Sequence, residues 1–401
     1  MSRGALSSVG GHGWHDLPPA FSGVSTVAVR RRRFPTGIVL SIGAVLIAMG
    51  AFAAVQTSAN LRFDDASATY QDVRSDATAA RSSLETGTEE LAATTEAAER
   101  LVAGNTGILM DGVPLDELDT AITDAREAAA TAEDLIAVQT PRSADKPGWF
   151  WELYGAADEL DAHAADADAL VDDLDAQGPI TDDAGAAVTA TASTVMTAAA
   201  AAAPGFEAAH ISARNQDIIA LRDAAAAVTA LTDLDDDAVS RFTTLQAAAA
   251  QVVVSQDAEL AEKAGPLLGA RLEVEAYARS LAPGVLIEFD WAPVVNGFGG
   301  DGGMGGYTTW WWDEPDRSVI LLSNSVAEQW PAARSKALIA HEVGHAISVK
   351  CEDMYDSSTQ DSIEKWATAW AISMGHTDDA NGVWAYGYPP ESYITAAAGC
   401  R

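Results

Sequence analysis

Two histidines four residues apart, with a glutamate beside the first, form the pattern in this sequence that is best able to do chemistry. His341, Glu342 and His345 stand in the run His-Glu-Val-Gly-His, an HExxH pattern. Side chains four positions apart share one face of an α-helix, so both imidazoles can bind one metal ion. Glu342 then lies near the open side of that ion, where it can accept a proton from water. The pattern predicts a metal-dependent hydrolase with Zn²⁺ as its cofactor.

The residues around this pattern are expected to form a helix with one apolar face. Apolar residues recur at helical spacing on the side opposite the histidines, at Ile339, Val343, Ala346 and Ile347. Trp330-Pro331 offers a helix start, because proline at the first helical position gives up an amide that would be unpaired anyway. The alternative interpretation is a helix whose histidines only pack or face solvent.

A third protein ligand is expected downstream, because catalytic zinc usually has three such ligands and a water molecule. Glu364 is the best candidate, since Ala367 and Ala371 follow it at helical spacing and would let a second helix approach the first closely. Asp361 and Glu364 could instead form a capping box at the start of that helix. The remaining candidate ligands are Asp353, Asp356, Asp361 and His376, the last of which could equally cap a helix C-terminus.

HExxH followed by Glu-x-x-Ala resembles the gluzincin branch of the zinc metallopeptidases, in which a glutamate on the following helix completes the site. The resemblance covers roughly the last third of the chain and implies hydrolysis of peptide bonds. Glu342 would act as general base and pass the proton to the leaving amine. Tyr386, Tyr388 and His376 are candidate donors to the oxyanion, with Tyr386 taken as the catalytic residue, although each could simply pack.

A small α+β domain is expected over residues 265–401. The expected elements are a helix at Pro266–Leu281, strands at Val285–Trp291, Tyr307–Trp312 and Ser318–Ser323, a turn at Asp313–Asp316, and then the two helices of the site. This order is similar to that of compact zincins, where an edge strand beside the metal holds an extended substrate. The resemblance therefore makes the second strand the candidate substrate-binding segment, with Tyr307, Thr308, Thr309 and Trp310.

Two unusual runs flank that second strand. The glycine-rich segment 297–306 lacks the Lys-Ser or Lys-Thr of a phosphate-binding loop, so a flexible loop at the rim of a cleft is the better interpretation. On a strand, Trp310 and Trp312 point one way and Trp311 the other. At least one indole is therefore expected to face the cleft, a partner or lipid.

An uncharged apolar run at Gly37–Val55 follows four arginines at Arg30–Arg33 and predicts one transmembrane anchor within residues 34–56. By the positive-inside rule the N-terminus stays in the cytoplasm and the rest lies outside. A cleaved signal peptide is the alternative, because Ala51–Ala53 resembles a cleavage site. Residues 1–33 are rich in Gly, Ser and Pro and are expected to be disordered.

The chain has two cysteines, Cys351 and Cys400, both in the expected α+β domain. An even pair fits a disulfide in a protein that acts outside the cytoplasm. Closing a loop of about 50 residues would contribute roughly 4 kcal/mol in the chain-entropy model.

Residues 57–264 are rich in Ala, Asp, Glu and Thr and predict a long helical stalk or bundle. A coiled-coil-like seam runs through Tyr70, Val73, Ala77, Ala80, Leu84, Gly87, Leu91, Thr94, Ala98 and Leu101. Breaks are expected at Gly104, Pro141–Pro147, Gly178-Pro179 and Pro204-Gly205, giving an antiparallel bundle. Four functions are open for this region: holding the C-terminal domain away from the membrane, sensing a ligand, binding a partner, and self-association.

The net charge of −34 argues against binding to nucleic acid or to anionic lipid. The sequence thus predicts a mostly α protein with an anchor, a helical stalk and a C-terminal zincin-like domain that cleaves protein or peptide substrates outside the cell. The alternative function is a surface stalk or adaptor whose C-terminal domain binds a metal without hydrolysis.

Overall fold

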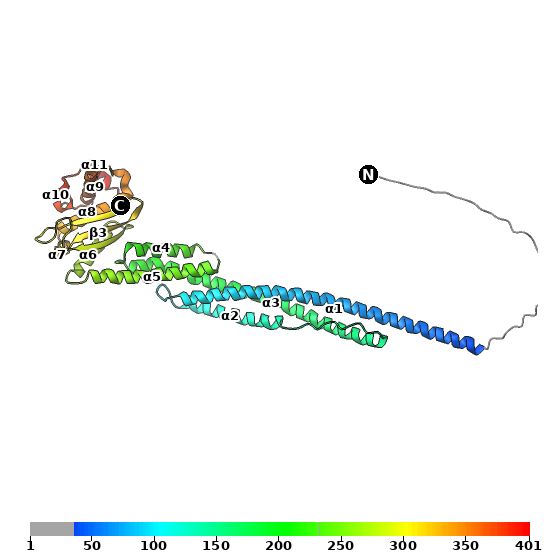
Figure 1. The fold of residues 1–401 in the computed structure, drawn as a ribbon. Coiled ribbons are helices and arrows are strands. Elements are labelled where there is room, and N and C mark those ends of the chain that lie inside the picture. Colours follow the sequence, from blue (N-terminus) through cyan, green and yellow to red (C-terminus); the bar gives the residue numbers. More distant parts are fainter. Residues whose placement is uncertain (1–35, 232) are drawn as a thin grey trace, which may run out of the picture. The chain divides into compact units, whose positions relative to one another are not determined.

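The computed structural model describes residues 36–231 and 233–401, and their side chains from residue 42 onward. The predicted disordered segment 1–33 lies outside the described residues. The chain forms two compact units: unit 1 takes the chain up to Ala68 together with Ser143–Asp161, and unit 2 takes Thr69–Arg142 together with Ala162–Arg401. Helices predominate, and the described strands form one small sheet, as expected for a mostly α protein (Figure 1).

Helix α1, Thr36–Gly104, contains the uncharged apolar run and continues beyond it without interruption. In the described part of the chain two helices are long and apolar enough to cross a membrane: α1, and α3, Phe150–Ala209. The most apolar window of α1 is 6% buried, whereas that of α3 is 39% buried. Membrane association is therefore indicated by length and composition, with α1 offering the more exposed surface.

In unit 1 the first turns of α3 run parallel to α1. Gln56 pairs with Phe150 at the start of α3, and Arg62 pairs further along with Asp158 and Asp161. In unit 2, α2, Val113–Ile136, runs antiparallel to α1. The expected fully antiparallel bundle is therefore wrong for α1 and α3, because the non-helical segment 137–149 carries the chain on beyond α2 before α3 begins.

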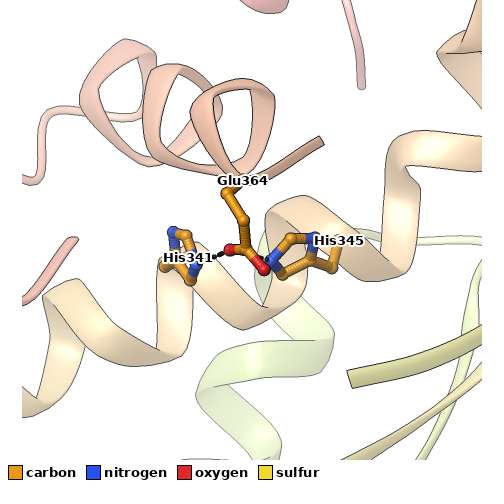
Figure 2. A group of neighbouring side chains, drawn as sticks. All are labelled: His341, His345 and Glu364. Atoms are coloured by element: carbon orange, nitrogen blue, oxygen red, sulfur yellow. Dashed lines mark hydrogen bonds and ion pairs between the residues drawn. The ribbon is translucent and has the colours of Figure 1, made fainter. Parts of the chain in front are cut away.

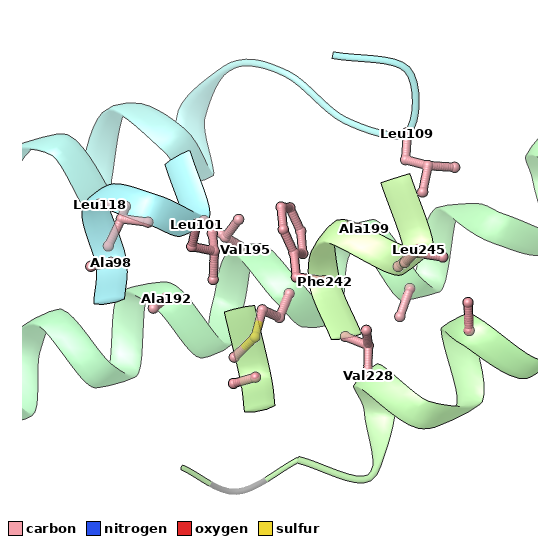
Figure 3. Close-up of a cluster of buried hydrophobic side chains, with 14 of the residues drawn as sticks. Ala98, Leu101, Leu109, Leu118, Ala192, Val195, Ala199, Val228, Phe242 and Leu245 are labelled. Carbon is pink, nitrogen blue, oxygen red and sulfur yellow. The ribbon is translucent and has the colours of Figure 1, made fainter. Parts of the chain in front are cut away.

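The helical part of unit 2 also contains α4, Asn215–Thr229, and α5, Asp236–Glu262. Its core joins side chains from all five helices and includes Ala98, Leu101, Leu118, Val195, Val228, Phe242 and Leu245 (Figure 3). On α1, the predicted seam positions Tyr70, Ala77, Leu84, Leu91, Ala98 and Leu101 are buried. The predicted seam is thus confirmed as the face that α1 buries.

Two expected helix breaks do not occur, because Pro179 and Pro204 lie inside α3. Gln177 and Thr181, on either side of Pro179, are buried, and the Gln177 amide donates to the Ala128 carbonyl of α2. Packing against neighbouring helices therefore outweighs the local cost of proline. The breaks at Gly104 and Pro141–Pro147 are present.

The α+β part of unit 2 begins with α6, Leu268–Leu281, followed by β1, Leu286–Ala292, β2, Gly306–Trp311, and β3, Glu314–Ser323. The sheet order is β1-β3-β2, with β1 parallel and β2 antiparallel to β3. β2 is therefore an edge strand, as expected. The expected turn Asp313–Asp316 is shorter, because Glu314 already pairs with Trp311.

Helices then cover the sheet. They are α7, Asn324–Glu328; α8, Ala333–Ser348; η1, Val349–Met354; α9, Gln360–Ser373; η2, Asp379–Asn381; α10, Val383–Tyr386; and α11, Glu391–Ala397. α8 packs on β2 and β3, and α9 packs on α8 (Figure 1). The predicted start of α8 at Pro331 is wrong: Pro331 lies in a turn, and Ala332 precedes the first helical residue.

The apolar face predicted for α8 is confirmed, since Ile339, Val343, Ala346 and Ile347 are buried against sheet residues such as Phe289 and Leu322 and against Trp366 and Trp370 of α9. The Cys351–Cys400 disulfide is present and joins η1 to the C-terminal end of the chain. Both features hold α8 and α9 in a fixed relation to the sheet.

Polar and charged groups join the helices α4 and α5 to the α+β part. Asn215 at the start of α4 donates to the Ser318 carbonyl of β3. Lys263, at the end of α5, lies 3.3 Å from Glu259 and 3.2 Å from Glu275 of α6, and all three side chains are at least 97% buried. Arg214 also pairs with Glu259 and Arg279 with Glu275, so the buried charges are compensated, as they must be because each would be costly if left alone.

Candidate functional site

The predicted ligand residues converge on one point between two helices. His341 and His345 project from α8, and Glu364 reaches down from α9 (Figure 2). The Glu364 Oε2 atom lies 3.2 Å from His341 Nε2 and 3.1 Å from His345 Nε2. One ligand atom from each residue lies within 4.8 Å of the others, so the three form a possible metal-binding triad.

A glycine in α8 permits this convergence. A Cβ atom at Gly344 would lie only 2.9 Å from the carbonyl oxygen and 3.0 Å from the Cα of Ala367 in α9. α9 therefore touches the backbone of α8 where Gly344 has no side chain. The prediction that small residues allow close approach of the helices is confirmed for Ala367, and Glu364 lies one turn earlier on the same helix.

The chemistry of the donor set fits a divalent metal ion. His341 Nδ1 lies 3.1 Å from the carbonyl oxygen of Asn381, which can only accept, so Nδ1 carries the proton and Nε2 is free to bind a metal. Ligands at about 2.0–2.1 Å in a tetrahedron are separated by roughly 3.3 Å, close to the 3.2 Å and 3.1 Å that separate Glu364 Oε2 from the two imidazole nitrogens. Burial acts to raise the pKa of Glu364, but its interactions with the neighbouring His341 and His345 outweigh burial and hold that pKa below its usual range.

Aromatic rings flank both histidines. Trp310 of β2 stacks on His345, with ring centroids 5.2 Å apart and planes 2° from parallel. Tyr386 of α10 stacks on His341 at 5.7 Å. Trp310, one of the three consecutive tryptophans, thus faces the site, as expected. The next one, Trp311, instead packs against Arg317, whose guanidinium lies 3.7 Å from the indole ring. The imidazoles are 96% buried and have little freedom to rotate.

Glu342 is held beside the triad by strand β2. The Thr308 hydroxyl donates to Glu342 Oε2 over 2.7 Å, and a Cβ atom at Gly306 would lie 2.3 Å from Glu342 Oε1. Burial raises the pKa of Glu342, opposed by His341 and by the Thr308 hydrogen bond. A carboxylate so placed is a stronger base than an exposed one.

The predicted substrate-binding residues divide between different roles. Thr308 is buried and its side chain contacts Glu342, whereas Tyr307 is exposed on the edge strand. Trp310 supports His345, as described above, and Thr309 is half-buried. The structure therefore places the segment beside the site, but directs two of its four side chains towards residues of the site itself.

A cavity of about 220 Å³ opens beside His341 and Glu342. Much of its wall is apolar, formed by Phe298, Met304, Leu338, Trp384 and Ala385. Phe298 from the glycine-rich loop meets Trp384 of α10 edge-to-face at 5.8 Å. Arg334 and Asp379 also line it, with their charged atoms 3.8 Å apart. The glycine-rich loop thus lies at the rim, as expected.

Of the three candidate oxyanion donors, Tyr386 alone among the described residues lines this cavity. Burial and then the neighbouring Glu364 carboxylate raise the pKa of Tyr386 to about 12, so its hydroxyl stays protonated. Tyr388 is 66% exposed, and His376 Nε2 pairs with the Tyr277 hydroxyl at 3.0 Å. His376 therefore has another partner, away from the triad.

The remaining alternatives for the ligands lie outside the triad, and Asp353 is exposed in η1. Asp361 pairs with Lys365, Asp356 accepts from Ser358, and the capping box is absent because Thr359 caps α9. Among the described residues, only His341, His345 and Glu364 form a group that could hold a metal ion. Glu364 Oε1 accepts from Gln360, which fixes the rotation of the carboxylate.

Sequence reasoning missed three residues that shape the site and named a fourth, Thr308, in another role. Thr308 contacts Glu342, Asn381 orients His341 through its backbone, and Gly306 and Gly382 leave room for Glu342 and His341. Gly382 has φ +103°, and a Cβ atom there would lie 2.6 Å from His341 Nδ1. A backbone carbonyl has no signature in the sequence, whereas the alternation of side chains along β2 could have indicated that Thr308 faces the site.

Comparison with protein-family models, curated proteins and solved structures gives no match.

Proposed function

We propose that this chain is a membrane-anchored zinc peptidase of the gluzincin type, whose α+β domain acts outside the cytoplasm. The observation that carries the proposal is the meeting of His341, His345 and Glu364 from two helices, with Glu342 held beside them. The HExxH pattern supplies three of these residues, and its spacing alone would leave the third ligand undetermined.

A zinc ion at the triad would lower the pKa of a water molecule to about 7 and polarise the carbonyl of a peptide bond. Glu342 accepts the proton of the attacking water and delivers it to the nitrogen of the leaving amine. Its hydrogen bond from Thr308 keeps the carboxylate oriented between these two transfers. Tyr386 remains protonated and donates a hydrogen bond to the oxygen on which negative charge develops.

The substrate is an extended peptide that pairs with the free edge of β2, since β3 occupies only the other edge. One of its side chains enters the cavity beside Glu342. The apolar lining from Phe298, Leu338 and Trp384 favours an aliphatic or aromatic side chain there.

The site faces the outside because α1 serves as the anchor. Its apolar surface is exposed where side chains are described, and the arginines that precede it favour the cytoplasmic side. The disulfide between Cys351 and Cys400 agrees with an oxidising compartment.

The test is cleavage of a peptide library by the purified full chain in detergent, followed by mass spectrometry. We expect cleavage beside apolar residues, loss of cleavage with a chelator and restoration by Zn²⁺. Glu342→Gln should reduce kcat/KM by about 10²–10⁴-fold while leaving the zinc content unchanged.

Glu328→Gln is the matched control, because Glu328 is exposed at the end of α7. It should retain full activity. Binding of zinc at one equivalent without any turnover would contradict the peptidase proposal and favour a non-catalytic adaptor.

A further inference from the structure

Four aromatic residues gather on the surface of unit 1. Phe52 lies on α1, and Trp149, Phe150 and Trp151 lie at the start of α3. Phe52 is 47% exposed, Trp149 is 52% exposed and Trp151 is 55% exposed. The two indoles stack at 5.2 Å, and Phe52 meets Trp149 edge-to-face at 6.5 Å and Phe150 at 5.9 Å. An exposed cluster of this size is unusual for a surface that faces only water.

The cluster is fixed at one level along α1. The Gln56 side chain donates to the Gly148 carbonyl at 3.1 Å and accepts from the Phe150 amide at 3.0 Å. These two bonds hold the start of α3 beside the last turn of the uncharged apolar run, which ends at Val55. The rings therefore lie where the apolar surface of α1 stops.

The surface of unit 1 becomes charged directly beyond this level. Arg62 pairs with Asp158 and Asp161, and Lys146 pairs with Asp64. Ten residues of helix separate Phe52 from Arg62, a rise of roughly 15 Å. On the other side, the apolar side chains of α1 at Ile42, Val45, Leu46, Ile47 and Met49 are exposed. The cluster therefore lies at the boundary between an apolar surface that suits lipid and a charged surface that suits water.

We propose that Phe52, Trp149 and Trp151 form an interfacial belt that lies in the headgroup region of the bilayer. Indole rings favour this region because they combine a large apolar surface with a polar N–H group. The belt sets the depth of α1 and places the first turn of α3 at the membrane surface. The partner is zwitterionic lipid, because the acidic chain has no basic cluster here to attract anionic headgroups. This inference rests on the proposed anchoring role of α1 and is independent of peptidase activity.

The experiment uses the full chain reconstituted in phosphatidylcholine vesicles, with and without lipid brominated near the headgroup end of its chains. The chain has 11 tryptophans, so the emission of Trp149 and Trp151 is obtained as the difference between wild type and Trp149→Phe/Trp151→Phe. Phenylalanine preserves the apolar contacts, and circular dichroism checks the fold. The single variants Trp149→Phe and Trp151→Phe replace the double variant if it does not fold.

We expect the difference emission to fall by about twofold with brominated lipid and to resist iodide in the water phase. Emission that iodide quenches as freely as it quenches N-acetyltryptophanamide, with no effect of bromine, would overturn the belt. Resistance to both quenchers would also overturn it, because another protein surface would then cover the rings. Flotation of the vesicles tests the anchor separately. A chain that floats with the vesicles but shows no quenching by bromine refutes the belt alone. A chain that does not float refutes both the belt and the anchoring role of α1.

Discussion

The helical region and the α+β part of this chain hold themselves together in different ways. Much of the core between α1, α2 and α3 is alanine, with Ala98, Ala125 and Ala192 among its fully buried residues. The core of the α+β part instead contains Phe289, Trp366 and Trp370, all fully buried. Small side chains bury little area each, so the helical region depends on length and helix propensity. The α+β part depends on the fit of large side chains, and among the described residues the possible metal-binding triad lies there, between two helices.

This difference predicts that two glycine-to-alanine changes have opposite effects: Gly344→Ala in α8 should reduce activity, whereas Gly205→Ala in α3 should increase stability. Gly344→Ala would place a Cβ atom 2.9 Å from the Ala367 carbonyl, so α9 must move away and carry Glu364 with it. Since a misplacement of about 1 Å can cost on the order of 100-fold in rate, we expect that loss in kcat/KM together with weaker zinc binding. Steady-state kinetics and zinc titration measure both. Unchanged zinc affinity and activity would show that close contact of α8 and α9 is not required.

The link between the two regions should be the most sensitive point for stability. Lys263→Met removes the buried cation that Glu259 and Glu275 share and leaves each with one arginine, Arg214 or Arg279, so the loss should approach the roughly 3–5 kcal/mol of a broken buried ion pair. Thermal unfolding followed by circular dichroism measures the change. Lys365→Met is the control, because Lys365 pairs with Asp361 in an exposed i,i+4 pair whose loss costs less than about 1 kcal/mol. Equal effects of the two substitutions would contradict the structural role of the buried pair.

The contact between β2 and the base predicts a change in pH dependence. Thr308→Val removes a hydrogen bond that lowers the pKa of Glu342, so that pKa should rise. Glu342 must be ionised to accept a proton, and the acid limb of the kcat/KM profile should therefore move to higher pH. Thr309→Val, at the next position on β2, should leave the limb in place. A profile that is the same in both variants would exclude Thr308 from positioning the base.

The smallest expected effect lies in the helical region. A Cβ atom at Gly205 in α3 would meet nothing within 4 Å, so Gly205→Ala should stabilise the chain by about 0.5–1 kcal/mol without changing activity. Thermal unfolding tests this as well. A loss of stability there would show that α3 is packed as tightly as α8.

Features that depend on residues close together in the sequence could be predicted without a structure. The placement of His341 and His345 on one helix face follows from their spacing, and the approach of Glu364 to them follows from the small residues after it. The interruption of α3 at Pro179 and Pro204 was predicted wrongly, because packing with other helices decides it. The parallel course of α1 and α3, and the roles of Thr308 and Asn381, depend on contacts between distant segments that local patterns do not specify.

Zinc content of the full chain tests the central claim most directly. After loading with Zn²⁺ and removal of the excess, wild type and Glu328→Gln should each retain about one zinc ion per chain. His345→Ala and Glu364→Ala should each lose most of it while circular dichroism shows retained helices. Full zinc retention by Glu364→Ala, at unchanged affinity, would contradict a site built from three ligands on α8 and α9.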